Sequence, residues 1–407
     1  MRLPVFALAL GAFAIGTTEF VTMGLLPEMA GTFGVSIPAA GWLVTAYALG
    51  VVVGAPVLTA AAHRFSRRQV LVGLMVVFTV GHIASALAPT FALLVASRVV
   101  SALTHGAYFG ASALVARQLA APGRQGRAMA WVASGVTLAN VVGVPLGTAV
   151  GQQLGWRLTY GTVAVIGALT ITAIAVLVPH LPTSGGNLRG ELRAFGRPQV
   201  WLTLLITVLG FSGMFAVLSY ITPILTQVTG YPESRVPWLL VLFGLGTTIG
   251  NLLGGRLADW SIPRTLVGGF LVLVFVFALF WATSGDAVGA AAGVFAFGFS
   301  GFAMGTAIQA RAIIAAGGAA SMVAAAQQAA FNVGNALGAF LGGGAIALGL
   351  GFRAPILVAA LLALAGLLAM LLAERLDRTG RLPVERRVSV PESEFDSESA
   401  SVPSVAA

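Results

Sequence analysis

The chain contains no cysteine and no lysine, and only 9% of its 407 residues are charged. Without cysteine, disulfide bonds and thiolate metal sites are excluded. Without lysine, there is no G-x-x-x-x-G-K-[ST] loop for nucleotide phosphates. The four histidines are scattered and no G-x-S-x-G pattern occurs, so metal-ligand spacing and a nucleophile elbow are both missing. We therefore expect a protein that is not an enzyme and that holds no metal and no cofactor.

Long apolar runs replace the missing charges. Hydrophobic residues make up 58% of the chain, whereas a soluble chain carries about 25% charged residues. This composition predicts an all-α protein embedded in a lipid bilayer. A span takes about 20 residues, and the sequence offers twelve, at residues 4–26, 39–61, 69–88, 91–116, 127–150, 158–179, 199–221, 236–258, 264–284, 287–311, 322–348 and 353–374.

All 22 basic residues are arginine, and their distribution predicts the orientation of the spans. With a cytoplasmic N-terminus, eighteen arginines lie inside, three lie outside (Arg157, Arg235 and Arg353) and Arg98 lies within a span. The excess predicts that both termini are cytoplasmic. The net charge of +9 is then a topological signal, and we expect no nucleic-acid partner. We expect a multi-pass protein of a bacterial inner membrane.

An internal repeat divides the spans into two groups of six. Three glycine patterns recur at an offset of 195 or 196 residues, and the longest pairs Asn140-x-x-Gly143-x-x-x-Gly147 with Asn335-x-x-Gly338-x-x-x-Gly342. Secondary transporters built from two such halves bind substrate between them. We assign the N-terminal half, a cytoplasmic linker, the C-terminal half and a disordered cytoplasmic tail to residues 1–181, 182–198, 199–377 and 378–407.

Glu19 lies inside the first span, where an unpaired charge costs roughly 2.5–3.5 kcal/mol on insertion scales. The other acidic residues fall in loops, at span ends or in the tail. A rise of 1.5 Å per residue places Glu19 roughly 6 Å outside the bilayer midplane, and Arg98 of the fourth span at a similar depth. The shared depth predicts an ion pair, direct or through water. Such a pair either takes part in proton coupling or simply fixes the two spans.

Several motifs resemble the major facilitator superfamily and, within it, the twelve-span drug:proton antiporter family, over roughly residues 5–375. Arg98 with Gly106 resembles the intramembrane arginine motif. Further likenesses are the loop signature Gly254-Gly255-Arg256-Leu257-Ala258-Asp259 and the exporter motif Gly143-Val144-Pro145-Leu146-Gly147. The runs Thr18-Glu19-Phe20 and Gly24-Leu25-Leu26-Pro27 are similar to a branch with arabinose-efflux and chloramphenicol-resistance transporters.

The resemblance implies twelve helices in two pseudo-symmetric halves that rock between inward-open and outward-open states. It implies proton coupling through Glu19 and Arg98, with His105 either assisting or only packing. Gly143, Pro145 and Gly147 are expected to allow close helix approach and a kink.

The resemblance also implies a conformational lock, in which Asp259 at a helix end pairs with arginine in one state and separates in another. Its expected members are Arg64, Arg67, Arg68, Gly255, Asp259 and Arg264. The three arginines of the first half fit plain topological signals equally well, because His63 stands where that half would carry the matching aspartate.

The first, fourth, seventh and tenth spans line the cavity in the resembling fold, which favours four substrate contacts: Thr22, Tyr108, Tyr220 and Gln309. Other polar residues within spans are further candidates, namely Tyr47, Asn140, Gln227, Gln327, Gln328, Asn332 and Asn335. For Asn140 and Asn335 we favour helix–helix hydrogen bonds. His82 of the third span is interpreted as structural.

We therefore expect a monomeric secondary transporter that exports a small drug-like organic molecule in exchange for protons. The nearest alternative is an exporter of sugars or nucleosides, which the glutamine and asparagine residues in the spans favour. A membrane enzyme or receptor would need a catalytic constellation or a sizeable soluble domain, and neither is visible. A channel would not need a two-half repeat.

Overall fold

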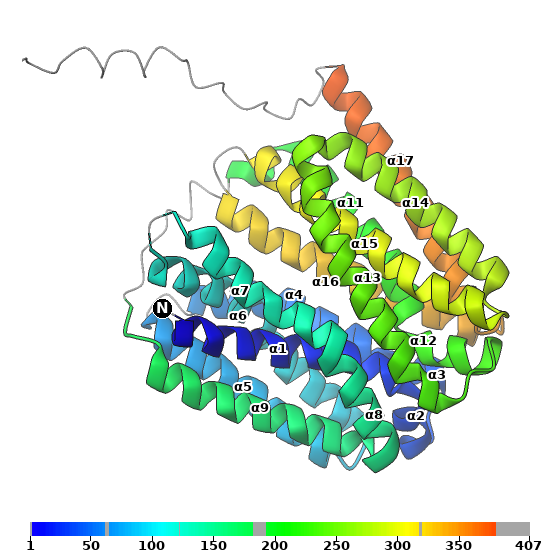
Figure 1. Ribbon diagram of the computed structural model, residues 1–407, viewed down its shortest axis with the longest axis horizontal. Coiled ribbons are helices and arrows are strands. Elements are labelled where there is room, and N and C mark those ends of the chain that lie inside the picture. Colours follow the sequence, from blue (N-terminus) through cyan, green and yellow to red (C-terminus); the bar gives the residue numbers. More distant parts are fainter. Residues whose placement is uncertain (1, 62–64, 122, 182–192, 317–319, 380–407) are drawn as a thin grey trace, which may run out of the picture.

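The computed structural model describes residues 2–61, 65–121, 123–181, 193–316 and 320–379. Every regular element in these ranges is helical, and twelve helices are long and apolar enough to cross a membrane, which confirms the fold class that the hydropathy pattern predicts. Figure 1 shows the helices arranged in two bundles, one blue to green and the other green to orange. We call them the N half and the C half.

The N half contains α1 (Arg2–Gly24), α2 (Leu26–Phe33), α3 (Ile37–Ala40), α4 (Trp42–Ala61), α5 (Arg67–Leu87), α6 (Phe91–Leu119), α7 (Gln125–Leu138), the π-helical turn η2 (Ala139–Gly143), α8 (Val144–Leu154) and α9 (Trp156–Leu177). The C half contains η3 (Arg193–Gly196), α11 (Pro198–Leu218), α12 (Ile221–Pro223), η4 (Ile224–Val228), η5 (Glu233–Arg235), α13 (Val236–Trp260), α14 (Ile262–Thr283), α15 (Ala287–Ala316), α16 (Ala320–Ala347) and α17 (Ala354–Arg378).

Local sequence explains where several helices begin. Ser66 and Gln69 form a reciprocal capping box at the start of α5. The Thr90 hydroxyl accepts a hydrogen bond from the Leu93 N–H at the start of α6. Gly155, with φ of 94°, makes the turn from α8 into α9, because only glycine adopts such a backbone without strain. These capping and turn residues lie in the loops, between the apolar runs of the sequence.

Equivalent glycines of the two halves make equivalent helix contacts. A side chain at Gly143 would collide with Thr17 of α1, and a side chain at Gly338 would collide with the Ser212 carbonyl of α11. Close approach through small residues is the usual way in which helices pack inside a membrane. The repeat found in the sequence therefore has a structural counterpart, in which the fifth span packs on the first as the eleventh packs on the seventh.

The two halves meet at the end of the bundle opposite the N-terminus, which we call the distal end. Figure 1 shows α2, α3, α8 and α12 gathered there. The helix α1 stops at Gly24, and Pro27 of α2 has no N–H to donate to the Met23 carbonyl. The Thr222 hydroxyl of the C half lies 3.2 Å from the Met23 oxygen and 3.1 Å from the Gly24 oxygen. The break between α1 and α2 thus leaves backbone carbonyls that accept a hydrogen bond from the C half.

Candidate functional site

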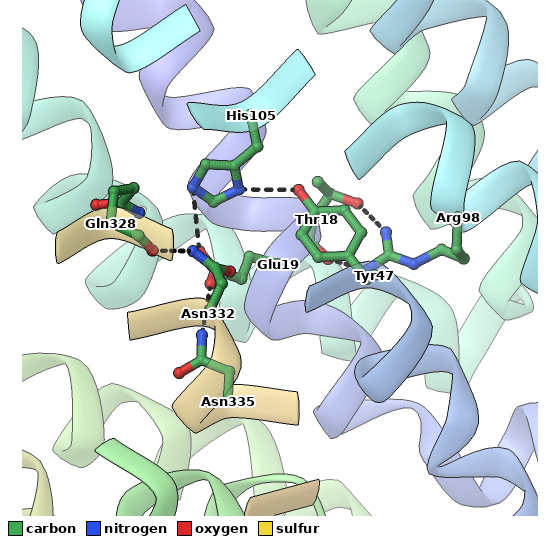
Figure 2. Close-up of polar contacts among 8 residues, drawn as sticks. All are labelled: Thr18, Glu19, Tyr47, Arg98, His105, Gln328, Asn332 and Asn335. Atoms are coloured by element: carbon green, nitrogen blue, oxygen red, sulfur yellow. Dashed lines mark hydrogen bonds and ion pairs between the residues drawn. The ribbon is translucent and has the colours of Figure 1, made fainter. Parts of the chain in front are cut away.

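Glu19 lies within α1 and is only 7% exposed. Its Oε1 accepts a hydrogen bond of 3.3 Å from Asn335 Nδ2, and its Oε2 lies 4.0 Å from His105 Nε2 (Figure 2). His105 belongs to α6 of the N half and Asn335 to α16 of the C half. One buried carboxyl group therefore contacts both halves of the molecule.

His105 connects Glu19 to Tyr47 of α4. The Tyr47 hydroxyl lies 3.2 Å from His105 Nδ1, and the two rings meet edge to face with centroids 6.0 Å apart. When the Tyr47 hydroxyl donates to Nδ1, the neutral imidazole carries its hydrogen on Nε2, which faces the Glu19 carboxyl group. The result is a polar chain from Tyr47 through His105 and Glu19 to Asn335. Such a chain has the chemistry of a proton relay.

Arg98 is fully buried and is held by its neighbours on two other helices of the N half. Nη1 donates to Thr18 Oγ1 at 2.7 Å and Nη2 donates to the Thr18 carbonyl at 3.2 Å. The Tyr47 ring centroid lies 4.1 Å from the guanidinium carbon, a cation–π distance. Tyr47 thus contacts both Arg98 and His105.

Within the described residues, Glu19 and Arg98 do not form the expected direct ion pair. The one charged-group contact of Glu19 there within 4.0 Å is with His105. Helix geometry explains the difference, since Thr18 and Glu19 are adjacent and project about 100° apart around α1. Arg98 meets the face that carries Thr18, whereas Glu19 points toward His105 and the C half. The expectation of a bridge through water is not tested by these contacts.

His82 of α5 joins the same network, beyond a purely packing role. Its Nδ1 lies 2.8 Å from the Phe78 carbonyl, so Nδ1 carries the hydrogen and donates. Nε2 lies 2.7 Å from Thr18 Oγ1 and, in the neutral ring, accepts from that hydroxyl. The Thr18 hydroxyl therefore accepts from Arg98 while it donates to His82. This arrangement fixes the orientation of the hydroxyl that holds the guanidinium.

A small cavity lies between the halves beside these residues. The space open to the centre of a water molecule is about 10 Å³, close to the roughly 10–15 Å³ that one water needs on this measure. Asn335 Oδ1 is buried and has no hydrogen-bond partner among the described residues. The lining residues are Glu19, Met23, Val44, Tyr47, Ala48, Arg98, Phe215 and Asn335. Tyr47 and Asn335 were only secondary candidates in the sequence, and both lie here.

Three of the four substrate contacts expected from the sequence use their hydroxyl groups elsewhere. The Thr22 hydroxyl lies 2.9 Å from the Tyr160 hydroxyl, Tyr108 donates to the Leu8 carbonyl and Tyr220 donates to the Ala339 carbonyl. These bonds connect neighbouring helices. Gln309 is exposed on α15. None of the four lines the small cavity of this conformation.

The expected lock residues lie at the ends of helices in both halves. Arg68 Nη1 lies 3.4 Å from His180 Nδ1, and the Arg67 N–H donates to the Leu181 carbonyl. Asp259 is exposed at the end of α13, and the Arg264 guanidinium lies 5.2 Å from the Trp260 ring centroid. Arg64 lies outside the described residues, and Gly255 is half-buried on α13. Within the described ranges, no salt bridge of Asp259 is formed in this conformation.

The π-helical turn η2 interrupts the fifth span and ends at Gly143, two residues before Pro145. Proline has no N–H, so a regular helix cannot continue unchanged across it. Gly143 and Gly147 face α1, where added side chains would collide with Thr17 and Val21. The motif therefore seats the fifth span against the helix that carries Glu19.

A buried ion pair in the C half was missed by the sequence reasoning, which took Glu19 and Arg98 as the buried charges. Arg311 Nη1 donates to Glu374 Oε1 at 2.9 Å, and Nη2 donates to Gln199 Oε1 at 3.3 Å. Arg311 and Glu374 are both buried. Because they lie near the ends of spans, hydropathy alone assigned them to the membrane surface. Their pairing connects α15, α17 and α11 within the C half.

Comparison with known proteins supplies independent information on the family. A model described as Major Facilitator Superfamily matches residues 8–328. The chain is 40% identical to the inner membrane transport protein YdhP of Escherichia coli (strain K12), over 92% of this chain and 97% of that protein. It is 35% identical to the putative transporter AraJ of the same organism, over 93% and 96% of the two chains. It is 36% identical to a chloramphenicol resistance protein of Streptomyces lividans, over 83% and 88%.

Solved structures with low sequence identity share the fold. A bacterial homolog of the human lysosomal transporter Spinster, in an inward-facing and unoccupied conformation, matches with a TM-score of 0.77 at 16% identity. A D-xylose–proton symporter matches with a TM-score of 0.73, also at 16% identity. Both matches cover 91% of this chain and 96% of the other chain. At this identity the likeness concerns the arrangement of helices alone.

Proposed function

The chain belongs to the Major Facilitator Superfamily and is a multi-pass membrane transporter rather than an enzyme, and we propose that it exports a small organic molecule in exchange for protons. Glu19 is the proposed proton carrier. His105 and Tyr47 are its relay partners, and Arg98 is the fixed positive charge beside it. The cavity between the halves is the proposed substrate path.

The observation that carries this proposal is the shared position of Glu19. Its carboxyl group contacts His105 of the N half and Asn335 of the C half. When the halves separate, the Asn335 hydrogen bond must break and the carboxyl group must meet water or substrate. Its environment thus differs between the two states of a rocking carrier, and its affinity for a proton follows the environment. This geometry supports a coupling between proton binding at Glu19 and conformation.

The proposed direction of transport follows from the orientation of the spans in the membrane. The excess of arginine on one side of the spans supports a cytoplasmic position for both termini. In the proposed orientation the distal end faces outward from a bacterial inner membrane, the membrane named for the relative YdhP. A proton that binds from the more acidic outside and leaves inside supplies the free energy for export. The exposed Asp259, with arginine near it, is proposed to lock a different state from the one described here.

The substrate class is proposed to be drug-like and amphipathic, because the cavity combines Met23, Val44 and Phe215 with the polar groups of Tyr47 and Asn335. The relative named a chloramphenicol resistance protein supports this class. A sugar or nucleoside remains the second candidate, since the polar side chains also suit hydroxylated solutes.

Counterflow in proteoliposomes tests the function. Purified protein is reconstituted with chloramphenicol, a pentose or a nucleoside inside, and uptake of the labelled solute is measured with and without a pH gradient. We expect counterflow of chloramphenicol, with uphill movement only when the compartment that receives the drug is the acidic one. Counterflow of only the pentose or the nucleoside selects the second candidate. Solute flux without counterflow indicates a channel and contradicts the proposal.

A further inference from the structure

Glu28 is a buried carboxyl group at the distal end, outside the membrane-spanning helices. It follows Pro27 in the first turn of α2, next to the carbonyls that receive the Thr222 hydroxyl of the C half. Both carboxylate oxygens of Glu28 are buried and have no hydrogen-bond partner within the described residues. Burying an unpaired carboxylate is expensive, whereas a neutral carboxylic acid is buried at much lower cost.

The charged surroundings of Glu28 add to this cost. Glu233 of η5, in the C half, repels a negative charge on Glu28. The neighbouring groups of α8 and α9 offer no neutralising charge: Gln152 is a neutral amide, and the Arg157 guanidinium lies over the Trp156 ring and donates to the Ala88 carbonyl. The helices α3 and α12 carry no titratable side chain, and the two charged residues of η5, Glu233 and Arg235, are both exposed.

We propose that Glu28 is a second proton-binding site, distinct from Glu19, which takes up a proton when the two halves close at the distal end. Closure brings the Glu28 carboxyl group out of water and next to Glu233 of the opposite half. Opening returns it to water, where the proton is released on the same side. The site therefore senses the pH of the compartment that the distal end faces. The Glu28 proposal rests on one part of the proposed function, namely that the two halves alternate between closed and open states. It does not depend on the substrate or on Glu19.

The sign of the effect follows from linkage. Burial is the largest cause and raises the pKa of Glu28 from 4.5 to about 7 in this closed conformation. The residue's own backbone N–H opposes this rise, repulsion by Glu233 adds to it, and the nearby Gln152 amide opposes it least. A carboxyl group with a raised pKa favours the closed state at low pH, and this advantage is lost as the pH rises toward 7. The ratio of closed to open molecules changes by at most about tenfold per pH unit in this window.

Electron spin resonance on the full chain measures this equilibrium. The absence of native cysteine allows two spin labels to be placed at Gln153→Cys and Ala287→Cys, which are exposed positions of the N half and the C half. Labels are attached at one pH, and the distance distribution is then recorded in lipid nanodiscs between pH 4.5 and pH 8. We expect the short-distance population to grow as the pH falls. No substrate is needed, so a failed transport assay leaves this test intact.

Three matched variants decide the assignment. Glu28→Gln is neutral at every pH, and we expect it to remove the part of the pH response between 4.5 and about 7 and to favour the closed distance. Glu233→Gln removes the repulsion, and we expect the response to move to lower pH, which provides a second test if Glu28→Gln folds poorly. In Glu19→Gln the response should persist. The proposal is overturned if the parent shows no pH response, if Glu28→Gln responds as the parent does, or if Glu19→Gln abolishes the response.

Discussion

Arg98 is fully buried among polar and aromatic neighbours, although its Nε has no hydrogen-bond partner within the described residues. A buried guanidinium is tolerated in a membrane protein only when hydrogen bonds and aromatic faces replace its lost water. The Thr18 hydroxyl and carbonyl accept the hydrogen bonds of the guanidinium. Tyr47 and Tyr160 supply the aromatic faces, with ring centroids 4.1 and 5.5 Å from the guanidinium carbon. The charge therefore keeps a fixed position beside Glu19 without neutralising it directly.

Replacing Thr18 by valine tests this account of Arg98. The substitution leaves Nη1 of Arg98 and Nε2 of His82 without their hydroxyl partner, and loss of a buried hydrogen bond to a charged group costs about 1–3 kcal/mol. We expect Thr18→Val to lower the thermal unfolding midpoint, which the seven tryptophans report by fluorescence. Thr18→Ser keeps the hydroxyl and should stay close to the parent. Equal unfolding midpoints for Thr18→Val and the parent would refute the claim that the Thr18 hydroxyl holds Arg98 in place.

At the scale of the helix, the fifth span shows how a sequence motif positions a site that lies on another helix. The turn η2 and Pro145 interrupt the regular hydrogen bonding, and Gly143 lets the backbone approach Thr17 of α1. Thr17 directly precedes Thr18 and Glu19. The position of the proposed proton site along α1 thus depends on a contact made by Gly143, which has no functional side chain.

Gly143→Val is the test of this contact. A valine side chain collides with Thr17 and Phe13, and overpacking in a close-packed interior costs about 1–3 kcal/mol. We expect a lower unfolding midpoint and reduced transport. The matched control is Gly161→Val in α9, where an added Cβ meets nothing within 4 Å. If both variants behave alike, the effect arises from helix propensity and the packing argument fails.

At the scale of the whole molecule, hydropathy and the repeat predicted the twelve spans and the equivalence of the two halves, because lipid imposes span length and small residues impose close packing. His105 was expected either to assist Glu19 or only to pack, and the structure brings the two side chains to 4.0 Å. Depth counting correctly placed Arg98 near them, since it depends only on the helical rise.

The remaining contacts depend on the rotation and register of helices far apart in the chain, which no local pattern encodes. The approach of Asn335 to Glu19 joins residues from opposite halves, and the stacking of Tyr47 on Arg98 requires the facing angle of α4 and α6. The choice of Thr18, rather than Glu19, as the partner of Arg98 is a difference of one residue on α1. The pair of Arg311 with Glu374 was hidden by its position near span ends.

The central claim, that Glu19 carries the coupled proton, is tested most directly by transport with the Glu19→Gln variant. Glutamine keeps the shape of the side chain and an oxygen for Asn335, but it cannot exchange a proton. In proteoliposomes, we expect Glu19→Gln to retain solute counterflow at equal pH and to lose the uphill movement driven by a pH gradient. Undiminished uphill movement in Glu19→Gln, driven by the same pH gradient as in the parent, would contradict the account.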